Sequence, residues 1–366
     1  MTTLAETSSS SLERLRLYYS RHEGRVAATF FAAGFVFDMV TVGRIDSWVT
    51  IGQQALYLGL ILAALIQMFV EQFNAPRERW YSKYRSPLVH FLLGALLNLY
   101  AIFYFKSSSL LVSFGFLGLL VSLLLANELK RIKSLGLPFK FGLLALCFLS
   151  FAACVVPIAF GSIGVAVFLT SMLAGSVPLA VLGFTSKPKE AARRHILVPL
   201  GCVLILFLTF YFFRLIPPVP LSIPFIGVYH NVEKTEAGYR LTHERPVWRF
   251  WHNGDQRFVA RPGDRVYVYF RVFSPGRFSD ELQMRWHWKG PGRGWILQDA
   301  IPIRIVGGRE QGFRGYAFKS KHQPGDWKVT IETADGREIG RVYFTLELAP
   351  EELGPEGERV FTTEID

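Results

Sequence analysis

Residues 141–158, FGLLALCFLSFAACVVPI, form an uninterrupted apolar stretch of 18 residues without a charged side chain. This length is typical of a helix that crosses a membrane, because roughly 20 apolar residues span a hydrocarbon core about 30 Å thick. The chain has seven predominantly apolar stretches, with expected bounds 26–43, 48–70, 87–105, 109–126, 141–158, 163–184 and 196–215. The sequence therefore predicts an α-helical polytopic membrane domain of about seven transmembrane helices over residues 26–215.

Basic residues are distributed unevenly among the connections between these stretches. Sixteen of the nineteen lysines and arginines before residue 216 lie in four segments, 1–25, 77–85, 130–140 and 187–194. Cytoplasmic connections carry an excess of Lys and Arg. We therefore expect a cytoplasmic N-terminal tail over 1–25, and an odd number of spans then places the residues after Arg214 outside the cytoplasm. We therefore expect a membrane protein that crosses the bilayer several times, with its N-terminus in the cytoplasm.

The formal net charge of +11 does not indicate a nucleic-acid partner. Residues 216–366 hold 21 basic and 20 acidic side chains, so the excess belongs to the apolar half of the chain. A nucleic-acid-binding protein concentrates basic charge on its soluble domain, so we expect no nucleic acid and instead a lipid bilayer as partner. Cys147, Cys154 and Cys202 all lie in predicted spans, which indicates packing residues and no disulfide framework.

From residue 225 the apolar residues alternate with polar ones. Runs such as Arg265-Val-Tyr-Val-Tyr-Phe-Arg271 are bounded by turn signals, and Asp335-Gly336 lies between two alternating runs. This pattern is typical of strands joined by tight turns. About eight strands are expected, at 225–232, 247–251, 265–271, 284–289, 301–306, 312–318, 327–332 and 338–347. Residues 225–348 are therefore predicted to form an extramembrane all-β antiparallel sandwich, Ig-like (immunoglobulin-like) in the broad sense.

Two segments flank this β module. Residues 216–224 contain four prolines, which disfavour a helix and favour extended polyproline geometry, so we expect a stiff stalk. Residues 349–366 are acidic and lack periodicity, which predicts a disordered tail.

Three groups of residues in the β module resemble a known family. They are Trp286-His287-Trp288-Lys289-Gly290, the run from Pro324 to Val329, and Asp335-Gly336-Arg337-Glu338-Ile339-Gly340 followed by Val342-Tyr343-Phe344. They are similar to a bacterial C-terminal module, domain of unknown function family 2914, over roughly residues 244–348. The resemblance implies an envelope-facing β module behind a membrane domain. It implies no activity, catalytic residue or cofactor.

Four polar side chains on three successive spans are expected at one depth in the membrane. At about 1.5 Å per residue, Asp38, Gln53, Gln54 and Asn98 lie about 8 to 10 Å from the outer ends of their helices. The short connection that holds Arg44 and Asp46 closes above them. Intramembrane polar groups are functional candidates, so one hypothesis is a small cavity for a ligand, a proton or an ion. The alternative is hydrogen bonding between packed helices, with Arg44 compensating the charge of Asp38.

Basic side chains of the β module form a second candidate site. Arg285, His287 and Lys289 alternate with Met284, Trp286 and Trp288, so the two sets lie on opposite faces of a strand. The possible partner-binding face comprises Arg249, Arg285, His287, Lys289, Arg293, Arg309 and Arg314. Such a face would present cationic groups to carboxylates or phosphates of an envelope polymer or protein. The alternative is a solvated basic face without a partner.

We expect no catalytic residue, no metal and no cofactor. The five histidines after residue 216 lack close spacing to another His or to a Cys. The glycine-rich segments 290–294 and 307–312 do not open a predicted helix, as a phosphate-binding loop does.

Two classes of function remain. In the first, the chain is a non-enzymatic envelope membrane protein whose seven-span anchor presents a β-sandwich that binds a protein or glycan outside the cytoplasmic membrane. In the second, it is a small transporter or membrane-embedded enzyme that uses the polar layer, with the sandwich as a lid or specificity module. The lack of a catalytic set favours the first.

Overall fold

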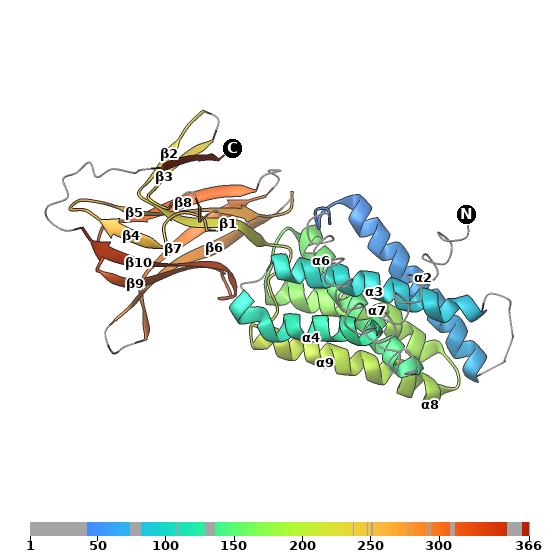
Figure 1. The fold of residues 1–366 in the computed structure, drawn as a ribbon. Helices are drawn as coiled ribbons and strands as arrows, with labels where there is room; N and C mark the ends of the chain where they lie inside the picture. Colours follow the sequence, from blue (N-terminus) through green and yellow to red (C-terminus); the bar gives the residue numbers. More distant parts are fainter. Residues whose placement is uncertain are drawn as a thin grey trace, which may run out of the picture. The chain divides into compact units, whose positions relative to one another are not determined.

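The structure is a computed structural model, and Figure 1 shows its fold. It describes residues 42–73, 82–107, 110–128, 136–236, 238–246, 248–249, 252–276, 278–290, 292, 294–307, 312–349 and 361–365. The chain divides into two compact units, residues 1–44 and 45–366. Residues 42–44 are the described part of the first unit, so Asp38 and nearly all of the expected first span lie outside the described residues.

The first part of the second unit is helical. Its helices are α2 (Trp48–Phe73), α3 (Ser82–Lys106), α4 (Leu110–Glu128), α6 (Leu137–Phe160), α7 (Val165–Thr185) and a final helix over Lys189–Phe212. The final helix joins α8 (Lys189–Ala192), a π-helical turn (Arg193–Leu197) and α9 (Val198–Phe212). Within the described residues, five of the six are long and apolar enough to cross a membrane, and α4 has a shorter apolar part over 114–123.

Helix α6 lies at the centre of the helical part. Fourteen of its 24 residues are buried, and it contacts α2, α3, α7 and α9. Small residues let the helices approach closely: a Cβ atom added at Gly175 of α7 would lie 2.9 Å from the carbonyl oxygen of Phe148 in α6. Outward-facing residues of α7, such as Leu173 and Phe184, are apolar and exposed. An apolar outer surface of this kind is typical of helices that contact the acyl chains of a bilayer.

Eleven described strands form three sheets after the helices. The three-stranded sheet has the order β1 (Ser222–Tyr229), β5 (Val266–Phe273), β8 (Phe313–Lys319). The five-stranded sheet has the order β4 (Arg257–Ala260), β10 (Glu338–Leu348), β9 (Gly325–Thr333), β6 (Ser279–Lys289), β7 (Trp295–Val306). The third sheet has the order β11 (Phe361–Ile365), β3 (Tyr239–His243), β2 (Asn231–Lys234). All neighbours are antiparallel except β4 and β10, which are parallel.

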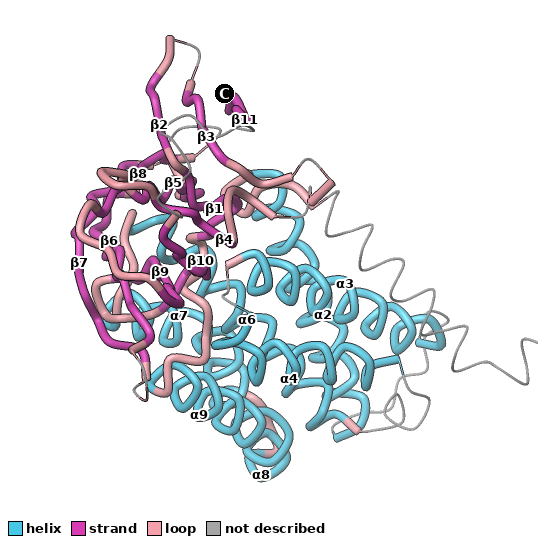
Figure 2. The backbone as a smooth tube through the Cα atoms, turned by 60° about the vertical axis from the view of Figure 1, so that its left-hand side comes forward, coloured by secondary structure: helices cyan, strands magenta, loops and turns pink. Residues whose placement is uncertain are grey.

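One apolar cluster is shared by the three-stranded and five-stranded sheets. Val268 and Phe270 of β5 belong to it, together with Trp286 of β6, Ile331 of β9 and Phe344 of β10. The alternation of apolar and polar residues expected for these strands is therefore observed, because every second side chain points into this core. Figure 1 shows these strands grouped to one side of the helices, and Figure 2 shows the same strands in magenta.

Several strands differ from those expected. The strands β3, β4 and β11 were not predicted, and the described residues of the expected strand 247–251, Trp248 and Arg249, lie outside any strand. Strand β11 falls within the segment 349–366 that was expected to be disordered. It pairs with β3 from Phe361 to Ile365, which carry two threonines and two apolar side chains of high β-propensity. Residues 350–360 lie outside the described residues.

The proline-rich segment 216–224 differs from the expected stiff stalk. The Val219 N–H donates to Pro217 O at 2.9 Å and the Leu221 N–H to Pro218 O at 3.1 Å, so these residues form tight turns. Ile216, Val219 and Leu221 are buried, and β1 begins at Ser222. The prolines therefore exclude a helix, as predicted, but their apolar neighbours pack against the protein instead of standing in solvent.

Ile331→Ala tests the shared core. Ile331 is fully buried in β9, so truncation should lower the free energy of unfolding by about 2 to 4 kcal/mol through lost burial and a residual cavity. Denaturant unfolding of the purified protein in detergent, followed by tryptophan fluorescence, measures this change. The control Glu281→Ala removes an exposed side chain of β6 and should change the free energy by less than about 0.5 kcal/mol. Equal effects of the two substitutions would contradict a core between the sheets.

Candidate functional site

The predicted polar layer lies partly within the described residues. Gln53 is exposed and its Nε2 donates to the hydroxyl of Tyr57 at 3.0 Å. Gln54 is buried and its Nε2 donates to the carbonyl oxygen of Thr50 at 3.1 Å. Both hydrogen bonds stay within α2 and do not link it to a neighbouring helix.

The other members of the layer are spread over two elements. Asn98 is half-buried on α3, eight residues before the helix ends at Lys106. Arg44 and Asp46 flank the buried Ile45 in the turn before α2. Because Asp38 supplies the carboxylate of the layer and lies outside the described residues, a shared polar cavity stays a prediction.

The predicted basic face is divided between the sheets. Arg285, His287 and Lys289 do lie on the outer face of β6, opposite the buried Met284 and Trp286. Arg285 Nη1 is 3.4 Å from Glu332 Oε2, and Lys289 Nζ is 3.8 Å from Asp326 Oδ2. Burial lowers the pKa of His287, and the nearby Lys328 lowers it further.

The remaining arginines of that prediction lie elsewhere. Arg314 belongs to β8 in the three-stranded sheet, where it stands opposite Arg271 of β5. Arg249 lies in the loop between β3 and β4, with its guanidinium 4.8 Å from the ring centroid of Trp248. Arg293 and Arg309 lie outside the described residues. The seven residues therefore do not form one continuous face in the part of the chain that the structure describes.

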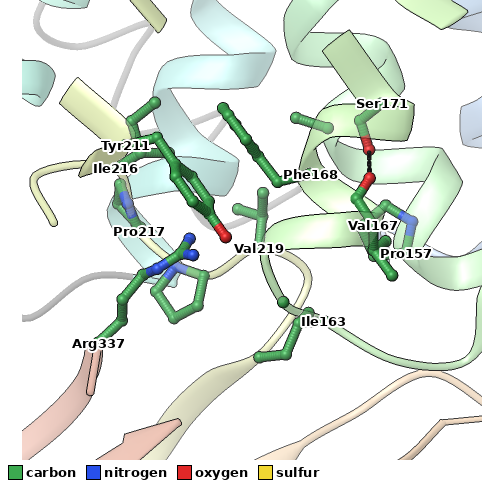
Figure 3. A pocket seen from close by; sticks show the side chains of 13 residues that line it. Pro157, Ile163, Val167, Phe168, Ser171, Tyr211, Ile216, Pro217, Val219 and Arg337 are labelled. Atoms are coloured by element: carbon green, nitrogen blue, oxygen red, sulfur yellow. Dashed lines mark hydrogen bonds between the residues drawn. The ribbon is translucent and has the colours of Figure 1, made fainter. Parts of the chain in front are cut away.

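A small cavity lies where helices α6, α7 and α9 meet the turn after α9 and the hairpin between β9 and β10 (Figure 3). The ring of Tyr211, near the end of α9, lies between the ring of Phe168 and the guanidinium of Arg337. The two ring centroids are 3.6 Å apart, and Arg337 Cζ is 3.5 Å from the Tyr211 centroid. This is a stacked aromatic pair extended by a cation–π contact.

The hairpin between β9 and β10 places Arg337 at this cavity. Gly336 adopts φ 78°, a left-handed conformation that glycine accepts without strain. The Thr333 N–H donates to Arg337 O at 2.8 Å and closes the turn. Asp335 then accepts a hydrogen bond from Arg337 Nη2 at 2.5 Å, which balances the charge of the nearly buried guanidinium. The Asp-Gly pair that the sequence indicated as a hairpin turn is thus confirmed.

Two hydrogen bonds join the same end of the helices to β6. The Ser279 N–H donates to Gly161 O at 2.9 Å, and the Ile163 N–H donates to Asp280 Oδ2 at 3.0 Å. The cavity itself has a volume of about 30 Å³, room for about two water molecules at ~10 to 15 Å³ each. A site of this size suits ordered water or a packing contact, and it is too small for an organic substrate.

A group of titratable side chains lies around His230, next to the start of β2 in the third sheet. His230, between β1 and β2, has its Nε2 3.7 Å from Asp255 Oδ2 and 3.9 Å from Glu244 Oε2. Its Nδ1 is 4.0 Å from Asp264 Oδ2. The imidazole stacks on Phe258 of β4, with ring centroids 3.9 Å apart. The titratable residues come from three loops, before β2, between β3 and β4, and between β4 and β5, so sequence spacing gave no sign of the group.

Burial sets the ionisation of this group. It raises the pKa of Asp255 to about 7 and lowers the pKa of His230 to about 4. It also raises the pKa of Glu244, while Arg261, 3.4 Å away, opposes that shift. Asp255 is buried and accepts the Glu244 N–H at 3.0 Å. No group of three potential ligands that could hold a metal ion is found among the described residues. A buried acid and a neutral imidazole make this a pH-sensitive structural contact.

Opposite pH dependences are expected from substitutions in this group. Asp255 has a folded pKa of about 7, above the unfolded value of 3.8, so it stabilises at low pH and loses this contribution as pH rises from 4 to 7. His230 has a folded pKa of about 4, below 6.5, so it stabilises above pH 6.5 and loses this contribution as pH falls. Relative to the unsubstituted protein, His230→Gln should gain stability from pH 7 to 4, and Asp255→Asn should lose it.

Unfolding free energies measured from pH 4 to 8 give the comparison. Each difference should reach about 2 to 4 kcal/mol, at 1.36 kcal/mol for each unit of pKa shift. Subtracting the unfolding free energy of the unsubstituted protein from that of each variant at the same pH removes the contribution of the other titrating carboxylates. If both variants follow the pH curve of the unsubstituted protein in parallel, the two groups do not titrate as the buried contact requires.

The solved structures that match the chain have low sequence identity to it and low TM-scores. An immunoglobulin-like protein from Pseudomonas aeruginosa is 9% identical with a TM-score of 0.22, over 35% of this chain and 98% of that one. A β-glucosidase from Listeria innocua is 9% identical with a TM-score of 0.20, and the match spans 25% of this chain but 15% of the enzyme. An alkylpurine DNA glycosylase from Pseudomonas fluorescens is 11% identical with a TM-score of 0.23, over 83% and 100%. Scores this low do not indicate a shared fold.

Sequence comparison is informative for the C-terminal part. No curated protein matches the chain. Residues 279–346, from the start of β6 to near the end of β10, match the family described as "Protein of unknown function (DUF2914)". All three groups of residues that carried the expected resemblance lie in this range, so the resemblance of the C-terminal module to DUF2914 is confirmed.

Proposed function

We propose that the chain is a multi-pass protein of a bacterial cytoplasmic membrane. Its helices anchor the β module, which lies outside the cytoplasm and binds an envelope protein or glycan there. The observation that carries this proposal is the alternation of long apolar helices with strongly basic connections.

Contacts at the helix ends support this topology. Arg85, near the start of α3, forms an ion pair with Glu71, near the end of α2, with Nη2 and Oε2 2.5 Å apart. Lys140, in the first turn of α6, donates to the Ser86 hydroxyl at 3.1 Å. Arg85 and Lys140 belong to two basic segments that are both expected in the cytoplasm, and here they meet at the same helix ends. The opposite ends of α6, α7 and α9 contact the β module, as a position outside the cytoplasm requires.

A binding role suits the β module better than catalysis. Two mostly antiparallel sheets that share one core support our proposal of an immunoglobulin-like sandwich, an architecture common in recognition domains. Among the described residues, the junction cavity holds only about 30 Å³, and the group around His230 is centred on a buried carboxyl, Asp255.

The β module is held directly against the helices instead of on a stalk. The contact of Arg337 with Tyr211 and the hydrogen bonds of Ser279 and Ile163 come from different segments of the module. Contacts at several points resist rotation better than a single linker does. We infer that the module presents one fixed surface to its partner.

Reporter fusions test the proposed topology. An export-dependent phosphatase should be active when fused after residues 45, 107, 160 and 230, because these positions follow outward-going spans. It should be inactive after residues 80, 135 and 190, where a cytoplasmic reporter should be active instead. An inactive phosphatase after residue 230 would show that the β module lies in the cytoplasm and would overturn the proposal.

Arg337→Gln tests the fixed placement of the module. Loss of the cation should remove a contact worth about 0.5 to 2 kcal/mol and broaden the distances between spin labels at Ala174→Cys and Ser320→Cys. Double electron–electron resonance measures these distances, in a background where the exposed Cys202 is replaced by Ala. The matched control is Arg341→Gln on the adjoining strand β10, since Arg341 pairs with Glu338 on the sheet. Equal widths in both variants would mean that Arg337 does not set the orientation.

A further inference from the structure

Two exposed aromatic rings meet on the outer face of the five-stranded sheet. Tyr343 of β10 points outward, because its neighbours Val342 and Phe344 belong to the core. Trp295, the first residue of β7, stands directly opposite the outward-facing Lys289 of β6 and so lies on the same face. The ring centroids of Trp295 and Tyr343 are 5.8 Å apart, although β6 and β9 separate their strands. We call these two side chains the aromatic platform.

A lysine of β9 holds the indole in place. Lys328 stands directly opposite Tyr343, and its Nζ lies over the Trp295 ring, 5.2 Å from the centroid. A cation–π contact contributes about 0.5 to 1 kcal/mol at an exposed site. Trp295 and Tyr343 nevertheless remain 38% and 40% exposed. The platform therefore offers open ring surface in a fixed orientation, so a ligand that stacks on it does not have to order the rings.

Charged side chains around the platform are paired with one another. Arg341 Nη1 donates to the Tyr343 hydroxyl at 2.7 Å, and Arg341 Nη2 donates to Glu338 Oε2 at 2.5 Å. Two further pairs on this face are Arg285 with Glu332 and Lys289 with Asp326. Each of these three cations is thus balanced by an acid of the same face. Such pairs give a polyanion little net charge to bind, but they present hydrogen-bond donors and acceptors side by side.

The main chain under the platform is already hydrogen-bonded. Strands β6, β9 and β10 each have a neighbouring strand on both sides. Their N–H and C=O groups are used in the ladders, so an extended peptide cannot add a strand to them. A partner on this face must therefore bind through side chains.

The chemistry of these side chains fits a sugar. A pyranose ring has C–H groups on its faces and hydroxyl groups around its edge. The C–H groups carry a small positive charge and pack on the negative face of an aromatic ring. The hydroxyl groups both donate and accept, so they can replace water at a pair such as Lys289 and Asp326. A protein surface that covered these ion pairs would have to remove their hydration, at a cost in binding free energy.

We propose that the aromatic platform binds an uncharged glycan of the envelope. One pyranose ring stacks on the exposed part of Trp295 with Tyr343 beside it, and its hydroxyl groups bond with the paired charges around them. A sugar with equatorial substituents suits the platform best, because both faces of its ring then present C–H groups. This inference rests on the proposed function, in which the module binds an envelope protein or glycan, and it assigns the partner to the glycans.

Titration of the full-length protein with chitohexaose, an uncharged β-1,4-linked hexamer of N-acetylglucosamine, tests the platform. Isothermal titration calorimetry in a detergent without a sugar headgroup should show saturable binding. The affinity should change by less than about twofold when salt is raised, because the ligand carries no charge to screen.

Substitutions locate the binding. Trp295→Leu should weaken it at least about tenfold, because the stacking surface is lost. Trp295→Tyr keeps an aromatic ring and should weaken it by less than about threefold. Tyr343→Ala should weaken it by about threefold or more through lost packing. The matched control Tyr316→Ala removes a similarly exposed tyrosine from β8 of the other sheet and should leave the affinity unchanged.

Two further oligosaccharides sharpen the test. Maltohexaose is also uncharged, but its axial linkages reduce the flat C–H surface, so it should bind at least about fivefold more weakly. Unchanged affinity in Trp295→Leu, or an equal loss in Tyr316→Ala, would overturn the proposal. Tighter, salt-sensitive binding of hexagalacturonate would also overturn it, since the partner would then be an anionic polymer.

The phosphatase fusions separate this inference from the proposed function. An active phosphatase after residue 230 without binding of chitohexaose would reject the glycan and leave the topology standing. An inactive phosphatase together with binding at Trp295 would reject the location of the module and leave the sugar site standing.

Discussion

The apolar cluster between the two sheets decides where the charged side chains of their strands can point. In a strand, successive side chains alternate between the faces, so burying Val268 and Phe270 forces Tyr267, Tyr269 and Arg271 outward. A slip of one residue would bury the arginine and expose the core, at a large cost in free energy. The outward position of Arg271 and the orientation of the hairpin that carries Arg337 both follow from this one burial pattern.

Local patterns in the sequence predicted the elements whose environment is uniform. The stretch 141–158 is apolar on all sides, and it lies in α6, which is as enclosed as α3 and more so than the other long apolar helices of the described part. The alternating run 265–271 became β5 because one of its faces meets the core. Short strands such as β4 were not predicted, since four residues, Arg257–Ala260, carry too little alternation to be distinguished from a loop.

Local sequence patterns could not predict contacts between segments that are distant in the sequence. The basic residues of β6 were correctly placed on one face, but their compensation by Glu332 and Asp326 depends on the neighbour β9. The opposition of Arg271 and Arg314 depends on a register that the sequence alone does not give. The segment 216–224 differs from the expected extended stalk for a similar reason. Its proline spacing indicates an extended chain, but the burial of Val219 and Leu221 depends on contacts with segments distant in the sequence.

The π-helical turn at Arg193–Leu197 has a consequence for the whole end of the final helix. Hydrogen bonds of the i→i+5 type accommodate one more residue than an α-helical turn, so every later side chain is rotated by about 100° relative to an uninterrupted α-helix. Tyr211 lies fourteen residues beyond Leu197 and still faces Phe168 and Arg337. The rotational phase of α9, set near the start of the final helix, therefore determines which aromatic ring meets the β module at the other end.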